Sequence, residues 1–155
     1  MLKRSAGIII YKYDNNELKI LLCHFGGPYW VDVERSWSLS KGVVEKGEKT
    51  LLAAKREFKE ETNLDFDGEL KYLWSKKISN KKLAVMFYSE GDYDLSNCKS
   101  NTFEMEYPKG SGKKCKFPEM DSYKWVNIIE ARKLLIPSQL CFLDKLEEKL
   151  NERSS

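Results

Sequence analysis

The chain has 155 residues, with 27 Lys and Arg against 24 Asp and Glu, which gives a formal net charge of +3. This length predicts a single domain of residues 1–155 that buries its own core. A charge so close to zero argues against nucleic acid or an anionic membrane as partners, because both normally require a concentrated basic face. No apolar run approaches the ~20 residues of a membrane span, and no signal-peptide core follows the first charges, so we expect a cytoplasmic protein.

Cysteine and histidine usage narrows the chemistry further. The four cysteines, Cys23, Cys98, Cys115 and Cys141, lie far apart and form no Cys-x-x-Cys pair, which favours free thiols over a zinc or redox motif. His24 is the sole histidine in the sequence, so catalytic triads with a histidine base and zinc sites with several histidines are disfavoured. Any catalysis must therefore depend mainly on carboxylates.

The first third of the chain predicts a hairpin followed by a loop. Residues 2–13 and 17–24 are two β-type runs on either side of the turn at 14–16. Gly26, Gly27 and Pro28 then break the pattern, and an aromatic-rich stretch up to Gly42 fits a loop or a short strand.

Residues 50–62 predict a helix. Leu51, Ala54 and Phe58 recur at helical spacing, with Thr50 as the N-cap and Asn63 as a left-handed C-cap. The predicted apolar face is expected to pack on the sheet.

The remainder predicts a second hairpin, a polar connection and a C-terminal helical region. The hairpin is expected over residues 69–78 and 82–89, and residues 91–120 read as a long ordered loop with a mobile tip at 109–114. A further strand is expected at 123–127, and the C-terminal region begins with the segment 128–135. An amphipathic helix should follow Pro137, with its apolar positions at Leu140, Leu143, Leu146 and Leu150. This order predicts the α/β or α+β class, a mixed β-sheet sandwiched between α-helices.

Three carboxylates converge on one face of the first predicted helix. At about 100° per residue, Glu57, Glu60 and Glu61 fall within one sector of the helix surface. Like charges at these spacings destabilise a helix, and a divalent cation between them removes that cost. Oxygen ligands of this kind favour magnesium or manganese. The alternative is a solvated acidic face balanced by the neighbouring Lys and Arg residues.

The spacing around this helix resembles the signature of the Nudix hydrolases. The matching positions are Gly42, Glu48, Arg56, Glu57, Phe58, Glu60, Glu61 and Leu64. Asn63 departs from the pattern, which has glycine there, but asparagine also tolerates a left-handed helix end. The segment Trp37 to Gly42 resembles a lead-in found in some members, with Ser40 where proline is usual. Further segments resemble a small bacterial subgroup of predicted pyrophosphohydrolases.

The resemblance implies the Nudix fold and cleavage of a pyrophosphate bond in a nucleoside diphosphate derivative by metal-activated water. It assigns Glu57 and Glu61 as metal ligands and Glu60 as a further ligand, with a backbone carbonyl near Lys41 or Gly42. Magnesium or manganese is the implied cofactor. It also implies that Glu48 and Arg56 form a supporting pair that fixes the loop against the helix.

One more carboxylate and two substrate contacts are predicted outside the signature. Some family members take a carboxylate six residues before a tryptophan, which here is Glu119 before Trp125, as an extra metal ligand or general base. Glu104 and Glu106 compete for that role, and the base stays open among Glu60, Glu61 and Glu119. Lys41 is predicted to contact a phosphate and Trp37 to stack on a base. The other candidates for base stacking are Trp30, Tyr107 and Phe117, and the 109–114 tip is a further candidate for phosphate contact.

The substrate class is narrowed but not fixed. The lead-in favours a dinucleoside polyphosphate, while nucleoside triphosphates, nucleotide sugars and ADP-ribose remain open. Two other classes of protein are also considered: a Nudix-fold nucleotide-binding or regulatory module without turnover, and a structural protein with an accidental acidic helix.

Overall fold

The computed structural model describes residues 2–154, which form a seven-stranded mixed sheet and a separate two-stranded sheet. The large sheet has the order β3-β2-β1-β6-β5, with β4 paired to β1 and β9 paired to β2. Its strands are β1 (Lys3–Asp14), β2 (Glu17–Phe25), β3 (Trp37–Ser38), β4 (Ser40–Val43), β5 (Lys71–Ser79), β6 (Lys82–Glu90) and β9 (Met120–Asn127). Both predicted hairpins, β1–β2 and β5–β6, are confirmed as antiparallel pairs. The parallel pairing of β1 with β6 makes the sheet mixed.

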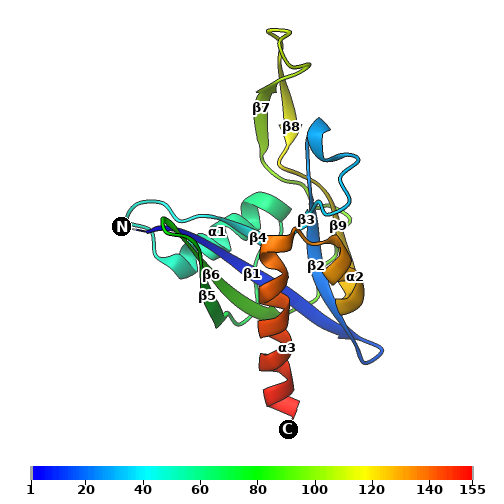
Figure 1. The fold of residues 1–155 in the computed structure, drawn as a ribbon. Coiled ribbons are helices and arrows are strands. Elements are labelled where there is room, and N and C mark those ends of the chain that lie inside the picture. The colour runs from blue at the N-terminus through cyan, green and yellow to red at the C-terminus, as the bar shows by residue number, and fades with distance from the viewer. Residues whose placement is uncertain (1, 155) are drawn as a thin grey trace.

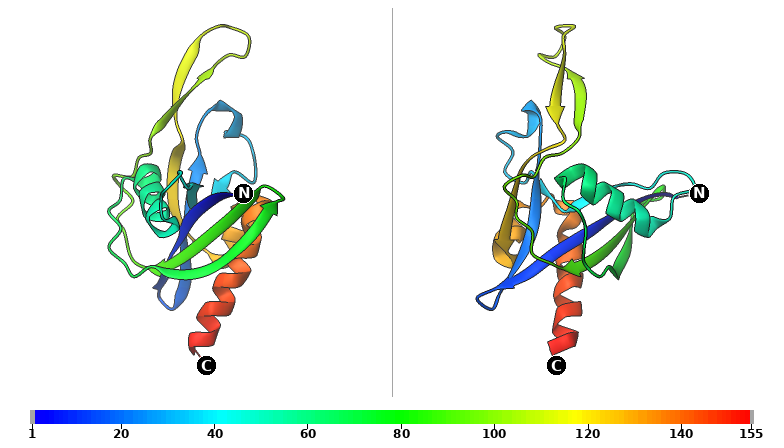
Figure 2. Two further views of the ribbon diagram at one scale, coloured as in Figure 1. Left: turned by 90° about the vertical axis from the view of Figure 1, so that its left-hand side faces the viewer. Right: turned by 180° about the vertical axis from the view of Figure 1, so that it is seen from behind.

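Helices cover the two faces of this sheet (Figures 1 and 2). Helix α1 (Thr50–Thr62) packs on one face, and α2 (Ile128–Leu134) and α3 (Leu140–Ser154) pack on the other. Alternation along β1 supplies both cores, because Ile8 and Ile10 pack with Phe58 of α1 whereas Ile9 packs with Leu143 of α3. The predicted helix sandwich is therefore confirmed. No helix of residues 2–154 is long and apolar enough to cross a membrane.

Helix α1 differs from its prediction at the N-terminus. Lys49 has the extended backbone of an N-cap, so Thr50 is already the first helical residue and makes no cap. Leu51 is 40% exposed, because the buried stripe runs through Ala53, Ala54 and Phe58. The predicted left-handed C-cap at Asn63 is confirmed, with φ 64°.

The predicted long loop contains a hairpin. Residues 102–118 form β7 (Thr102–Glu106) and β8 (Lys114–Pro118), which pair with each other and project from the body of the molecule (Figures 1 and 2). The loop prediction was wrong here because apolar and charged side chains alternate along both strands, with Phe103 opposite Phe117 and Glu104 opposite Lys116. The short helix η1 (Pro28–Trp30) lies beside the hairpin, with the Tyr29 and Tyr107 rings 6.1 Å apart. A second short helix, η2 (Pro137–Gln139), leads into α3.

Candidate metal and catalytic site

Strand β4 and helix α1 meet at Gly42. The strand pairs with β1 through Ala6 and Gly42, and this pairing turns Gly42 towards the helix. A Cβ atom built on Gly42 would lie 2.0 Å from Cδ of Glu57, so any side chain there collides with the carboxylate. The Glu57 carboxylate therefore sits directly on the backbone of β4, which requires glycine at this position.

Replacing Gly42 with alanine should damage the site specifically. The added methyl group displaces Glu57, and we expect kcat to fall about 100-fold or more and the free energy of unfolding to fall by about 1–3 kcal/mol. Gly47→Ala is the control, because Gly47 has φ 81° with no atom within 4 Å of the new methyl group. That variant should lose stability through backbone strain but keep its kcat; equal kcat values in both variants would contradict this role of Gly42.

Glu61 is the most buried carboxylate of the site, with 5% of its surface exposed. Its Oε1 accepts a hydrogen bond of 3.0 Å from the backbone N–H of Lys41, and the Tyr123 hydroxyl donates to its backbone carbonyl. Burial, followed by the charge of Glu57, raises the pKa of Glu61 to about 8. The protein therefore keeps a carboxyl group here whose charge is poorly compensated by its own neighbours.

Arg56 ties the signature loop to the helix. Its Nε donates to Glu48 Oε2 at 2.8 Å and its Nη2 to Glu48 Oε1 at 3.0 Å, a two-point pair that raises the pKa of Arg56 and lowers that of Glu48. Nη1 reaches Glu57 Oε1 at 2.9 Å and Glu60 Oε2 at 3.0 Å, while Nη2 also donates to the Val43 carbonyl. The structure thus brings Glu48 and Arg56 together and places Arg56 where it can orient Glu57.

Glu119 approaches the same cluster from the base of the hairpin. Its N–H donates to the carbonyl of Asn101, whose own N–H donates to the carbonyl of Glu60, each at 2.9 Å. The charge of Glu119 contributes to the raised pKa values of Glu57 and Glu61, after burial and nearer charges. The competing residue Glu106 instead accepts a hydrogen bond from Gly110 at the tip, and Glu104 stands opposite Lys116 along the hairpin.

The side chains of Lys41 and Trp37 lie on the other face of the sheet. Alternate residues of a strand point to the same face, so Trp37, Leu39 and Lys41 share one face and Gly42 lies on the opposite one. Leu39 is buried in the core under α3, whereas Gly42 faces α1. The Trp37 ring packs on His24, with 5.0 Å between ring centroids. The Trp37 ring therefore lies away from the carboxylates, whereas the Lys41 side chain remains close enough for the charge of Glu61 to oppose the lowering of its pKa by burial.

The other aromatic candidates pack on their own neighbours. Trp30 lies against Phe25 with ring centroids 4.6 Å apart, and Tyr107 packs on Phe117 with centroids 6.0 Å apart.

The donor set fits a hard divalent cation. Glu57, Glu60 and Glu61 offer oxygen atoms alone, and the buried hydroxyl of Ser40 approaches Glu61 without a hydrogen bond of good geometry. No group of three His, Cys, Asp or Glu side chains within residues 2–154 is already arranged around a metal position. Arg56 binds Oε1 of Glu57 and Oε2 of Glu60, which leaves the other oxygen of each carboxylate for a cation.

Sequence reasoning missed Tyr123 and Ser40. Tyr123 is 62 positions from the carbonyl that it contacts, so no local pattern indicates the contact. Ser40 could have been found from alternation, because it and Gly42 face the same way on β4.

A model of the NUDIX domain matches residues 1–146 of the chain. The chain belongs to the Nudix hydrolase family. A relative of this Nudix protein, the RNA pyrophosphohydrolase of Pelagibacter ubique (strain HTCC1062), is 27% identical over 158 residues, which cover 97% of this chain and 92% of the relative.

Solved Nudix structures have the same fold. An Ap4A hydrolase binary complex from C. elegans has 21% identity and a TM-score of 0.64, covering 97% of this chain and 99% of that chain. The NUDIX domain of Shewanella oneidensis NrtR, complexed with ADP ribose, has 14% identity and a TM-score of 0.69, covering 97% and 89%.

Proposed function

We propose that this Nudix protein, as a single domain of residues 1–155, is a magnesium- or manganese-dependent pyrophosphohydrolase for a dinucleoside polyphosphate or a nucleoside triphosphate. The observation that carries the proposal is the buried Glu61 carboxylate beside Glu57 at Gly42, with a pKa raised to about 8 by burial and by Glu57. A carboxyl group in such a site is stabilised as its anion by a bound cation, which links metal binding to the site.

The glutamates of α1 are proposed as metal ligands, and Arg56 as the residue that positions them. Glu57, Glu61 and Glu60 would hold the cation, together with a backbone carbonyl of β4 at Lys41 or Gly42. When bound, the cation neutralises phosphate oxygens and lowers the pKa of the attacking water. Arg56, held by Glu48, keeps the Glu57 carboxylate oriented.

Glu119 is proposed as the general base. Its carboxylate makes no hydrogen bond or ion pair with any other described residue, so its oxygens are available to accept the proton of the water. Partial burial and the charge of Glu60 raise its pKa, which favours proton uptake.

Two relatives inform the choice of substrate. The structural neighbour that is an Ap4A hydrolase supports a dinucleoside polyphosphate. The 27% identical RNA pyrophosphohydrolase favours a second candidate, the polyphosphate at the 5′ end of an RNA. The rival is a nucleotide-binding module without turnover, for which the ADP-ribose complex of the NrtR domain is a structural parallel.

A phosphate-release screen with magnesium and then manganese tests this proposal. The panel contains nucleoside triphosphates, diadenosine polyphosphates, 5′-triphosphate RNA, nucleotide sugars and ADP-ribose. We expect turnover of at least one polyphosphate, lost in Glu57→Gln and retained in Glu69→Gln, an exposed glutamate outside the cluster. A silent panel with metal-dependent nucleotide binding would favour the binding module.

A further inference from the structure

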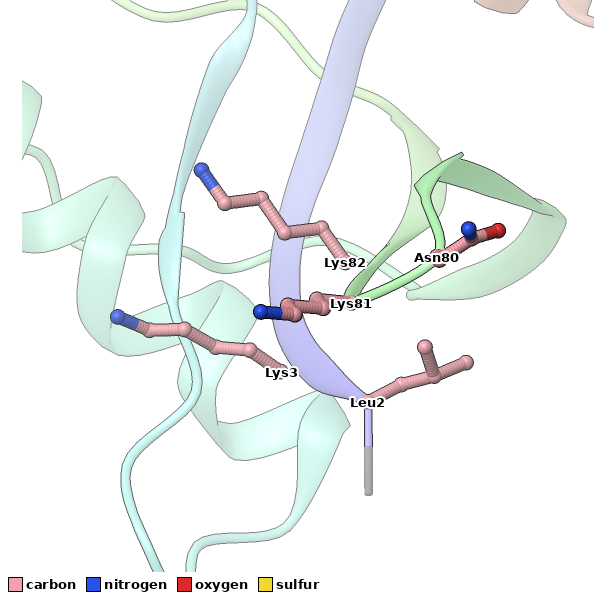
Figure 3. Close-up of a pocket in the computed structure, with 5 residues that line it drawn as sticks. All are labelled: Leu2, Lys3, Asn80, Lys81 and Lys82. Carbon is pink, nitrogen blue, oxygen red and sulfur yellow. The ribbon is translucent and has the colours of Figure 1, made fainter.

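Four lysines gather where β1 begins and the turn between β5 and β6 ends. This lysine cluster consists of Lys3, Lys41, Lys81 and Lys82. Lys3 and Lys82 are direct partners in the parallel β1–β6 pairing, and both line a cavity of about 240 Å³ together with Lys41. Lys3 and Lys82 also line an adjoining depression with Lys81. Figure 3 shows the side chains of Lys3, Lys81 and Lys82 pointing to one side, and Leu2 and Asn80 pointing to the other.

Within residues 2–154 no ion pair joins the cluster to a carboxylate, although Lys3 also lines a cavity with Glu45 and Glu48, and the charge of Glu61 opposes the lowering of the Lys41 pKa by burial. Some other lysines pair with carboxylates, as in Lys12–Asp92 and Lys124–Glu130. Within residues 2–154 the four ammonium groups form no ion pair or side-chain hydrogen bond, and no Asp or Glu lines the two cavities. Like charges on directly paired strand positions repel each other, and this repulsion destabilises the folded chain. An anion bound between the ammonium groups would remove the repulsion.

One short strand separates this cluster from the carboxylate site. On the α1 face, the backbone N–H of Lys41 donates to Glu61, and Gly42 supports Glu57. On the α3 face, the Lys41 side chain stands beside Gly7 in the neighbouring strand, where a Cβ on Gly7 would lie 2.5 Å from its Cβ. Strand β4 pairs with β1 alone among the described strands, and its other edge carries the Lys41 N–H bound to Glu61 and the Val43 carbonyl bound to Arg56. The carboxylate site therefore extends to this edge of the sheet, and a chain of phosphates bound there can continue past the edge to the α3 face.

We propose that the lysine cluster is a second phosphate subsite, which binds the outlying phosphates of a substrate that carries three or more linked phosphates. The proposal rests on the proposed hydrolase function and narrows its substrate class. A diphosphate such as ADP-ribose places its two phosphates at the carboxylate site and leaves the lysines without a ligand. A triphosphate or tetraphosphate carries extra negative charge, which requires further cations beyond the bound metal.

Binding of inorganic tripolyphosphate tests the subsite without turnover. In EDTA the metal-free carboxylates repel the polyanion. Titration calorimetry at low salt therefore measures the affinity of tripolyphosphate for the lysine cluster. We expect affinity to fall at least about fivefold in Lys3→Ala/Lys82→Ala and to stay unchanged in Lys133→Ala/Lys149→Ala, which removes the same charge from helices α2 and α3. Equal affinity in the two double variants overturns the proposal. Melting curves verify that both variants fold.

Steady-state kinetics test whether the bound phosphates belong to the substrate. In Lys3→Ala/Lys82→Ala we expect KM to rise at least about fivefold for the tri- or tetraphosphate that is turned over and less than twofold for ADP-ribose. An equal rise for both, or no rise for the longer substrate, overturns the assignment to the substrate. If nothing is hydrolysed but tripolyphosphate binding still depends on Lys3 and Lys82, the proposed hydrolase function fails and the phosphate subsite stands.

Discussion

Glu61→Gln is expected to lower kcat by at least about 1000-fold while raising the melting temperature of the metal-free protein at pH 8. The amide cannot bind a cation as the carboxylate does, but its oxygen can still accept the hydrogen bond from the Lys41 N–H. It also removes a buried charge whose pKa of about 8 reflects its unfavourable burial beside Glu57. Activity assays and calorimetric melting in EDTA would measure the two effects.

The combination matters more than either effect alone. A substitution that merely damages the fold lowers both activity and melting temperature, as Phe58→Ala should through a cavity under α1. A normal kcat in Glu61→Gln would show that Glu61 is not a metal ligand. A lower melting temperature in EDTA at pH 8 would show that its charge is compensated in the folded state.

Magnesium should stabilise the protein more at pH 8.5 than at pH 6. The pKa of Glu61 is raised from the 4.5 of an ordinary glutamate to about 8, first by burial and then by Glu57, so the folded protein holds this proton more tightly than the unfolded chain. Its contribution to stability is complete below about pH 4.5 and is lost as the pH rises through about 8. Saturating metal at 100 times its Kd adds about 2.7 kcal/mol, which corresponds to about 5–10 °C in melting temperature.

The same linkage predicts proton release on metal binding near pH 7. Calorimetric titration of magnesium in buffers of different ionisation enthalpy would count the protons. Tyr123, Lys41 and the carboxyl groups of Glu57 and Glu119 surround Glu61, and Glu61→Gln isolates the contribution of Glu61 from theirs. A metal-induced shift in melting temperature that is the same at both pH values in the wild type would contradict the link.

The sequence predicted those parts of the fold that follow from local periodicity. The apolar alternation of β1 and β2, and the helical spacing that ends at Asn63, need no knowledge of distant residues, and both appear as expected. The order of elements then placed helices on both faces of a mixed sheet. The Glu48–Arg56 contact also followed from the family resemblance, and the structure places these two side chains 2.8 Å apart.

The features that were missed depend on strand register and on distant contacts. Lys41 and Trp37 lie on the face away from the carboxylates because Gly42 faces α1. A shift of one residue in the register of β4 would place their side chains on the opposite face. The contact of Tyr123 with Glu61 and the chain from Glu119 through Asn101 to Glu60 join segments far apart in sequence. The hairpin at 102–118 was missed because the polar composition of residues 91–120 favours a long loop over paired strands.

The β7–β8 hairpin is joined to the rest of the protein mainly by backbone hydrogen bonds at its base. Its strands pair only with each other among the described residues, and its base is fastened through Asn101 to the last turn of α1 and through Glu119 to Gly26. Length and side chains between residues 102 and 118 can therefore change without breaking a ladder of the seven-stranded sheet. A graft from another member of the family, joined at Asn101 and Glu119, would exchange the protruding arm while the glutamates of α1 keep their places.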